Sequence, residues 1–88
     1  MKIFKYRLNT GLTQVLTTPG HTTFLKAGLD PTGAPVVWAI VDPSSNETTN
    51  WCFKLRWTLE GSPDAAVFNY LDTFEKKKHV YHVFYSKL

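Results

Sequence analysis

The side chains best suited to covalent chemistry in this chain are its single cysteine, Cys52, and its three histidines. Cys52 with His79 or His82 is the combination that resembles a nucleophile and its base. The spacing of these residues does not bring them together, and no acidic residue is positioned to orient an imidazole. The sequence therefore predicts an ordinary strand thiol and a protein that is not an enzyme.

Metal-ligating residues are present but scattered. The three histidines, the cysteine and the seven acidic residues show none of the close spacings that are typical of metal sites. His79 and His82 would point to opposite faces of a strand and could not chelate one ion together. Neither the dinucleotide-binding nor the P-loop glycine motif occurs. We therefore expect no metal and no cofactor.

The basic residues provide a first candidate binding set. Lys54 and Arg56 share one face of a predicted strand, and Lys76, Lys77 and Lys78 form a predicted hairpin tip. These cations could contact phosphate groups or an acidic partner. They could equally do no more than solvate sheet margins and prevent pairing with other chains, which is a common use of lysine. The sequence leaves both interpretations open.

Aromatic residues make up 15% of the chain and provide a second candidate set. Alternation along the strands predicts that the three tryptophans lie in the core. Tyr81 and Tyr85 fall on the opposite face of the last strand from Phe84, and tyrosine is favoured at half-wet interfaces. We expect these two tyrosines to be aromatic anchors on a contact surface.

Two segments dominate the predicted fold. Residues 36–43 read V-V-W-A-I-V-D-P, and six apolar residues in a row predict a central strand that is covered on both faces. Residues 51–59 alternate strictly between apolar and polar side chains, which predicts a long strand with one dry face and one basic, wetter face.

Weaker strand patterns occupy the rest of the chain. Segment 22–29 is predicted to place Leu25 and Ala27 on one face and Phe24 on the other. Segment 12–18 is predicted to bury Leu12 and Leu16. Residues 64–71 fit either a helix or a strand, and a short helical turn near 62–68 followed by a strand from about Asn69 is favoured. The other predicted strands cover residues 2–8 and 80–85.

These short segments, each bounded by turn residues, predict an all-β or mainly β fold. We expect six to seven short strands in a compact antiparallel sandwich or barrel, because parallel crossover units have no room. A length of 88 residues predicts one domain, residues 1–88, with a single core.

Charge and cysteine content indicate the kind of partner and the cellular compartment. The net charge of +3 favours acidic partners, and a single cysteine excludes an intramolecular disulfide and suits a reducing compartment. The start, M-K-I-F-K-Y-R, lacks the apolar stretch of a signal peptide, and the longest apolar run is too short to cross a bilayer. The sequence predicts no membrane partner, and a homo-oligomer stays possible.

Four segments, in order along nearly the whole chain, resemble a known family: Lys2-Ile3-Phe4-Lys5-Tyr6, Trp38-Ala39-Ile40-Val41-Asp42-Pro43, Tyr70-Leu71-Asp72-Thr73-Phe74 and Val80-Tyr81-His82-Val83-Phe84. They look like small uncharacterised proteins of tailed bacteriophages and prophages. The chain departs from that pattern at Asp72, where the family often has glycine, and in its lysine-rich tip. The resemblance implies a phage source and an all-β fold, without an established reaction.

By association with their source, small phage proteins without catalytic motifs tend to be host-takeover or counter-defence factors. We therefore expect a non-enzymatic phage accessory protein that acts in the host bacterial cytoplasm. It would inhibit a host protein, such as a CRISPR-type defence complex, by stoichiometric binding. The alternatives are an oligomeric sponge that sequesters cyclic-nucleotide defence signals and a nucleic-acid-binding module.

Overall fold

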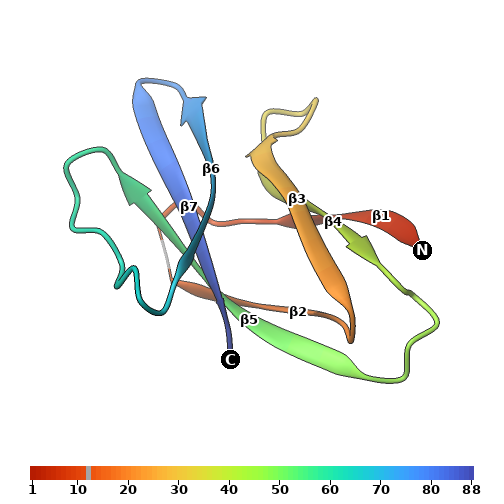
Figure 1. Cartoon of the computed structure of the whole chain (residues 1–88). Coiled ribbons are helices and arrows are strands. Elements are labelled where there is room, and N and C mark those ends of the chain that lie inside the picture. The colour runs from red at the N-terminus through yellow and green to blue at the C-terminus, as the bar shows by residue number, and fades with distance from the viewer. Residues whose placement is uncertain (12) are drawn as a thin grey trace.

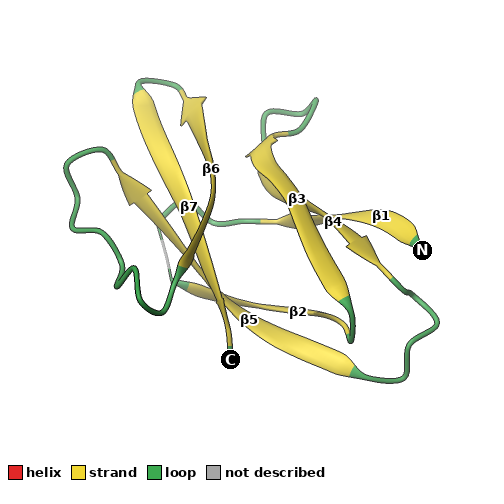
Figure 2. Cartoon of the chain, viewed as in Figure 1, coloured by secondary structure: helices red, strands yellow, loops and turns green. Residues whose placement is uncertain are grey.

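The computed structural model describes residues 1–11 and 13–88, and this part of the chain folds into two antiparallel sheets without a helix (Figures 1 and 2). Leu12, predicted to be buried beside the second strand, lies outside the described residues. The three-stranded sheet has the order β1-β4-β3 and the four-stranded sheet the order β2-β5-β7-β6. The strands are β1 (Lys2–Arg7), β2 (Gln14–Pro19), β3 (Thr22–Leu29), β4 (Pro35–Val41), β5 (Thr48–Trp57), β6 (Asn69–Lys76) and β7 (His79–Lys87).

The prediction of an all-β antiparallel fold is confirmed. The inward-facing side chains of both sheets meet in one core, to which β4 contributes Val37 and the four-stranded sheet contributes Phe53, Leu55 and Val83. All four are buried. The ring of Phe24 on β3 packs edge-on against Phe53 with centroids 5.0 Å apart, and this contact joins the two sheets.

β4 is central in its sheet, as predicted, because β1 and β3 pair with its two edges. Its inward residues Val37, Ala39 and Val41 are fully buried. On the outward face, however, Trp38 and Ile40 are half-buried. The expectation that both faces are covered thus holds on the outward face only at the buried Val36, because the sandwich has no third layer beyond this sheet.

The alternation along β5 also holds, with Phe53 and Leu55 directed into the core. The expectation that all three tryptophans lie in the core is wrong for Trp38, on the outward face of β4, and for Trp57, at one end of β5. Trp57 is the last residue of β5 and is 45% exposed, and its ring lies 4.3 Å from that of His79 between centroids. Trp51 packs against the core as predicted, because it lies further from the strand end.

A β-bulge changes the predicted faces of β3. The register with β4 shifts between Phe24 and Lys26, so Phe24 and Ala27 both face the core. Leu25 is 46% exposed instead of buried with Ala27. A bulge inserts one extra residue and reverses the phase of alternation, which strict two-residue periodicity cannot anticipate.

The two sheets are joined along one side by their edge strands β3 and β6, which lie next to each other (Figure 1). β6 has its own register shift between Tyr70 and Asp72. The Oδ2 atom of Asp72 accepts a hydrogen bond of 3.1 Å from the backbone N–H of Ala27. This bond gives an edge N–H of β3 a partner and links the margins of both sheets.

The segment that the sequence left ambiguous forms one turn and then a strand. The carbonyl oxygen of Asp64 accepts hydrogen bonds from the N–H groups of Val67 (3.0 Å) and Phe68 (2.9 Å). β6 begins directly afterwards at Asn69, as the strand interpretation predicted. The segment contains no helix among its residues.

Candidate binding face

The strongest candidate site is the solvent-facing side of the four-stranded sheet, which we call the outer B face. Strand register arranges its side chains in rows that run across β5, β7 and β6. One row is Lys54, Phe84 and Tyr70. The next row is Arg56, His82 and Thr73. The two cations predicted to share a strand face therefore do so, each beside a ring from β7.

Lys54 and Arg56 contact neutral groups on this face. The Nζ atom of Lys54 lies 4.7 Å from the centroid of the Phe68 ring, a cation–π distance. The Nη1 atom of Arg56 donates a hydrogen bond of 3.1 Å to the carbonyl oxygen of Leu55. Among the described residues, neither cation forms an ion pair. Both charges are thus free to meet an external anion.

His82 is fixed in place by hydroxyl groups on both sides. Its Nε2 atom lies 2.9 Å from the Oγ1 atom of Thr58, and its Nδ1 atom lies 3.0 Å from that of Thr73. Thr73 is in turn 2.7 Å from the hydroxyl of Tyr70. This chain of hydrogen bonds holds the middle of the outer B face in one geometry before any partner arrives.

Exposed apolar side chains border the two cations. Tyr70 is 59% and Leu59 100% exposed, and Trp57 lies beside Arg56 in the chain. The rings of Tyr70 and Phe84 meet edge to face with centroids 5.8 Å apart. A hollow of about 210 Å³ opens among these groups. Its lining residues are Arg56, Trp57, Thr58, Leu59, Glu60, Ser62, His82 and Phe84.

The predicted aromatic anchors point the other way, and that prediction is wrong. Tyr81 is 7% exposed and stacks on Phe74, and Tyr85 stacks on Phe53 at 5.8 Å. In the register Tyr85 lies opposite the core residue Phe53, and Tyr81 lies opposite Trp57 on the same inward side of the sheet. β7 carries apolar residues on both faces, so its own pattern could not show which face is dry. Tyr70 and Trp57 are the exposed rings that sequence reasoning missed.

Comparison with known proteins gives one family match, which covers residues 1–88 and is described as a domain of unknown function, DUF7352. The chain belongs to this DUF7352 family. No curated protein and no solved structure matches the chain. In the part of this DUF7352 domain that the structure describes, no helix is long and apolar enough to span a bilayer.

The lysine tip of the DUF7352 domain is a hairpin turn, as predicted, but it does not extend the outer B face as one cluster. Lys77 adopts a left-handed conformation with φ of 56° in the turn between β6 and β7. Lys76 directs its Nζ atom to the carbonyl oxygen of Gly33, 3.2 Å away on the loop of the other sheet. Lys77 and Lys78 are exposed. The tip thus lies beside the three-stranded sheet.

Cys52 lies on the same outer face of this DUF7352 domain, half-buried between Val15 of β2 and Ser86 of β7. The register places His82 opposite Arg56, four residues along β5 from Cys52. The structure therefore does not bring the thiol and this imidazole together. Within residues 1–11 and 13–88, no three potential metal ligands form a cluster.

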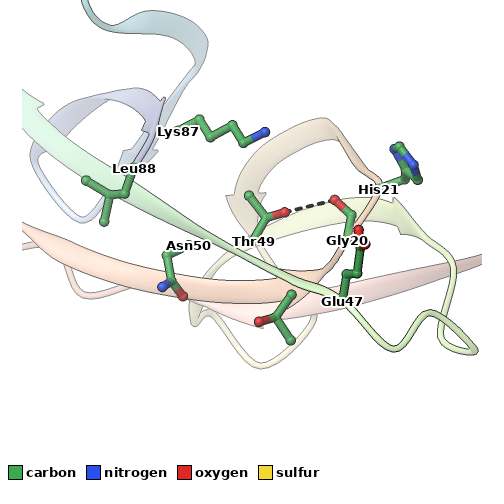
Figure 3. A pocket seen from close by; sticks show the side chains of 8 residues that line it. Gly20, His21, Glu47, Thr49, Asn50, Lys87 and Leu88 are labelled. Atoms are coloured by element: carbon green, nitrogen blue, oxygen red, sulfur yellow. Dashed lines mark hydrogen bonds between the residues drawn. The ribbon is translucent and has the colours of Figure 1, made fainter.

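A larger hollow of about 450 Å³ lies at the other end of β5 (Figure 3). Thr49 donates a hydrogen bond of 2.9 Å to the carbonyl oxygen of Gly20 across its floor. The side chains of His21, Lys87 and Asn50 diverge from one another and do not converge on a common point (Figure 3). This hollow is therefore an open polar groove, and its geometry does not assemble a site.

Proposed function

We propose that this protein is a non-enzymatic binding protein that occupies a partner's surface with its outer B face. The partner that we propose is a host protein, such as a component of a bacterial anti-phage defence complex. In this proposal the protein is a phage accessory factor that acts stoichiometrically in the host cytoplasm. The phage setting rests on the motif resemblance, and the mode of action rests on the composition of the face.

One observation supports this function most directly: an arginine without an ion-pair partner among the described residues lies one row away from an exposed tyrosine ring. Arg56 lies opposite His82 and is one row away from Phe84 and Tyr70. Arginine, tryptophan and tyrosine are the residues most enriched at the energetic centres of protein interfaces. The hydroxyl network of His82 holds the surface rigid, which lowers the entropy cost of binding.

The shape of the face favours a macromolecule over a small nucleotide. Sites for small ligands are typically concave and enclose roughly 300 to 1,000 Å³. The hollow beside Arg56 holds about 210 Å³ and is bordered by side chains that project outward, such as Leu59. A protein surface with a complementary projection and an acidic group would bury these side chains together.

Affinity capture from an extract of the bacterial host, quantified by mass spectrometry, tests this function. The wild-type protein should retain one partner at equal stoichiometry. The Arg56→Glu variant should lose that partner, because it places a negative charge where an acidic group is expected. Truncation of a central interface residue costs about 2 kcal/mol or more, or roughly thirtyfold in affinity.

The matched control is Lys87→Glu, which makes the same charge change at an exposed residue outside the two rows. This variant should retain the partner as the wild type does. Equal retention by Arg56→Glu and the wild type would contradict the proposal. Catalytic turnover of a captured molecule by the wild-type protein would also contradict it.

A further inference from the structure

The solvent-facing side of the three-stranded sheet, which we call the outer A face, carries a second arrangement of rings and cations. Strand register places Lys5 of β1 and Lys26 of β3 on either side of Trp38 of β4. The adjacent row consists of Arg7, Val36 and Gly28. A half-buried tryptophan thus stands at the centre of an open sheet between two lysines.

The Trp38 ring lies next to Gly28. The Cζ3 atom of Trp38 lies 3.8 Å from the point that a β-carbon on Gly28 would occupy. Lys26 is exposed beside the ring, whereas the ammonium group of Lys5 is held by Asp30.

Charge on this face is strongly one-sided. Its carboxylate, Asp30, is already engaged: its Oδ2 atom binds the Nζ atom of Lys5 at 2.9 Å, and its Oδ1 atom accepts from Thr32 and Ala34. Among the described residues, Arg7 and Lys26 form no ion pair. A hollow of about 230 Å³ lies between Lys5, Arg7 and the loop that carries Asp30.

We propose that the outer A face binds single-stranded nucleic acid. One unstacked base would lie on Trp38, and the phosphates on either side of that base would contact Lys26 and Arg7. Aromatic side chains and basic residues on an open sheet are the combination that single strands require, since every base has a π-face. In a duplex the bases are already stacked on one another and could not reach a half-buried ring.

This inference is independent of the proposed function, because it concerns the opposite side of the sandwich and a different class of partner. The lysine tip supports it. Lys76 contacts Gly33 in the β3–β4 loop, so Lys77 and Lys78 adjoin the end of the sheet at which Arg7 lies. A nucleic-acid strand that is bound across Trp38 could continue toward the lysine tip.

Fluorescence anisotropy with a labelled oligothymidine, measured at several salt concentrations, tests the inference. Two phosphate contacts predict a slope of log affinity against log salt of about −1.4 for a single strand. The Trp38→Leu variant should weaken binding roughly 5- to 140-fold without changing this slope, because it removes stacking but no charge. The Lys26→Gln variant should make the slope less steep by about 0.7.

Two comparisons make the result decisive. The Lys87→Gln variant removes an equal charge outside the outer A face and should bind as the wild type does. A duplex of the same length should bind more weakly than the single strand. Failure of the oligothymidine to bind at low salt would overturn the inference, as would equal affinity for the duplex. Binding to vesicles of anionic lipid without binding to the oligonucleotide would overturn it as well.

Discussion

At the scale of single residues, Asp30 has an unusually large number of hydrogen bonds for a loop carboxylate. The side-chain hydrogen bond from Lys5 is the largest cause that lowers the pKa of Asp30 well below its ordinary value of 3.8. Hydrogen bonds from Thr32 and from the N–H of Ala34 lower this pKa further. Asp30 therefore joins the β3–β4 loop to β1 only while it is ionised.

The free energy of unfolding should depend on the charge of Asp30. Because its pKa is lower in the folded state, the stabilisation is complete above about pH 4 and is lost as the pH falls from there toward the folded-state pKa. The urea concentration at the unfolding midpoint should be lower at about pH 3 than at neutral pH. This decrease should be larger for the wild type than for Asp30→Asn. An equal fall in both proteins would contradict this role.

Phe53 is the residue on which the core depends most. It is fully buried and contacts Phe24 and Tyr85, which come from both sheets. The Phe53→Ala variant should lose about 3–5 kcal/mol of the free energy of unfolding, measured by urea titration. The exposed Val15→Ala variant should change it by less than about 0.5 kcal/mol. A loss below 1 kcal/mol for Phe53→Ala, about the size of a typical substitution, would show that the core is not built around this ring.

At the scale of elements, the bulges in β3 and β6 decide which side chains meet. They direct Phe24 into the core and allow Asp72 to reach the N–H of Ala27 across the gap between the sheets. A β-sandwich built on unmodified alternation would leave the edge of β3 open at this point. An unpaired strand edge invites association with other chains.

Removal of the hydrogen bond between Asp72 and Ala27 should lower the free energy of unfolding. The Asp72→Ala variant leaves the buried N–H of Ala27 without its acceptor, which costs about 1–3 kcal/mol. The Asp72→Asn variant keeps an oxygen that can accept and should lose less. Chemical denaturation compares the two, with Glu75→Ala as the exposed control on the same strand. Equal stability of Asp72→Ala and wild type would show that the sheets hold together without the link.

The elements also show how far the sequence could be interpreted. The continuous apolar run of β4 and the two-residue alternation of β5 each predict a strand, because each pattern matches the burial that a strand in a sheet requires. The faces of β3 and β7 could not be predicted. In β3 the bulge after Phe24 reverses the phase of alternation. In β7 both faces are apolar, so the sequence pattern does not show that Tyr81 faces the core. Only the register against Phe53 settles the orientation of β7.

At the scale of the whole molecule, the protein is a sandwich of two sheets whose outer faces are both open (Figure 2). Each outer face combines cations with rings: Lys54 and Arg56 with Phe84 and Tyr70 on one sheet, and Lys5 and Lys26 with Trp38 on the other. The core occupies the inner faces alone. Function can therefore reside on the surface, where substitutions change binding without disturbing the fold.

The thiol of Cys52 provides the most direct test that the outer B face is the partner-binding surface. It is the only cysteine in the chain, and it lies on this face one row away from Lys54. The rate at which a maleimide modifies it can be followed in the free protein and in the purified complex, without any mutation. We predict that the partner slows this modification several-fold, because it covers the face. An unchanged rate in a complex of full stoichiometry would contradict the account.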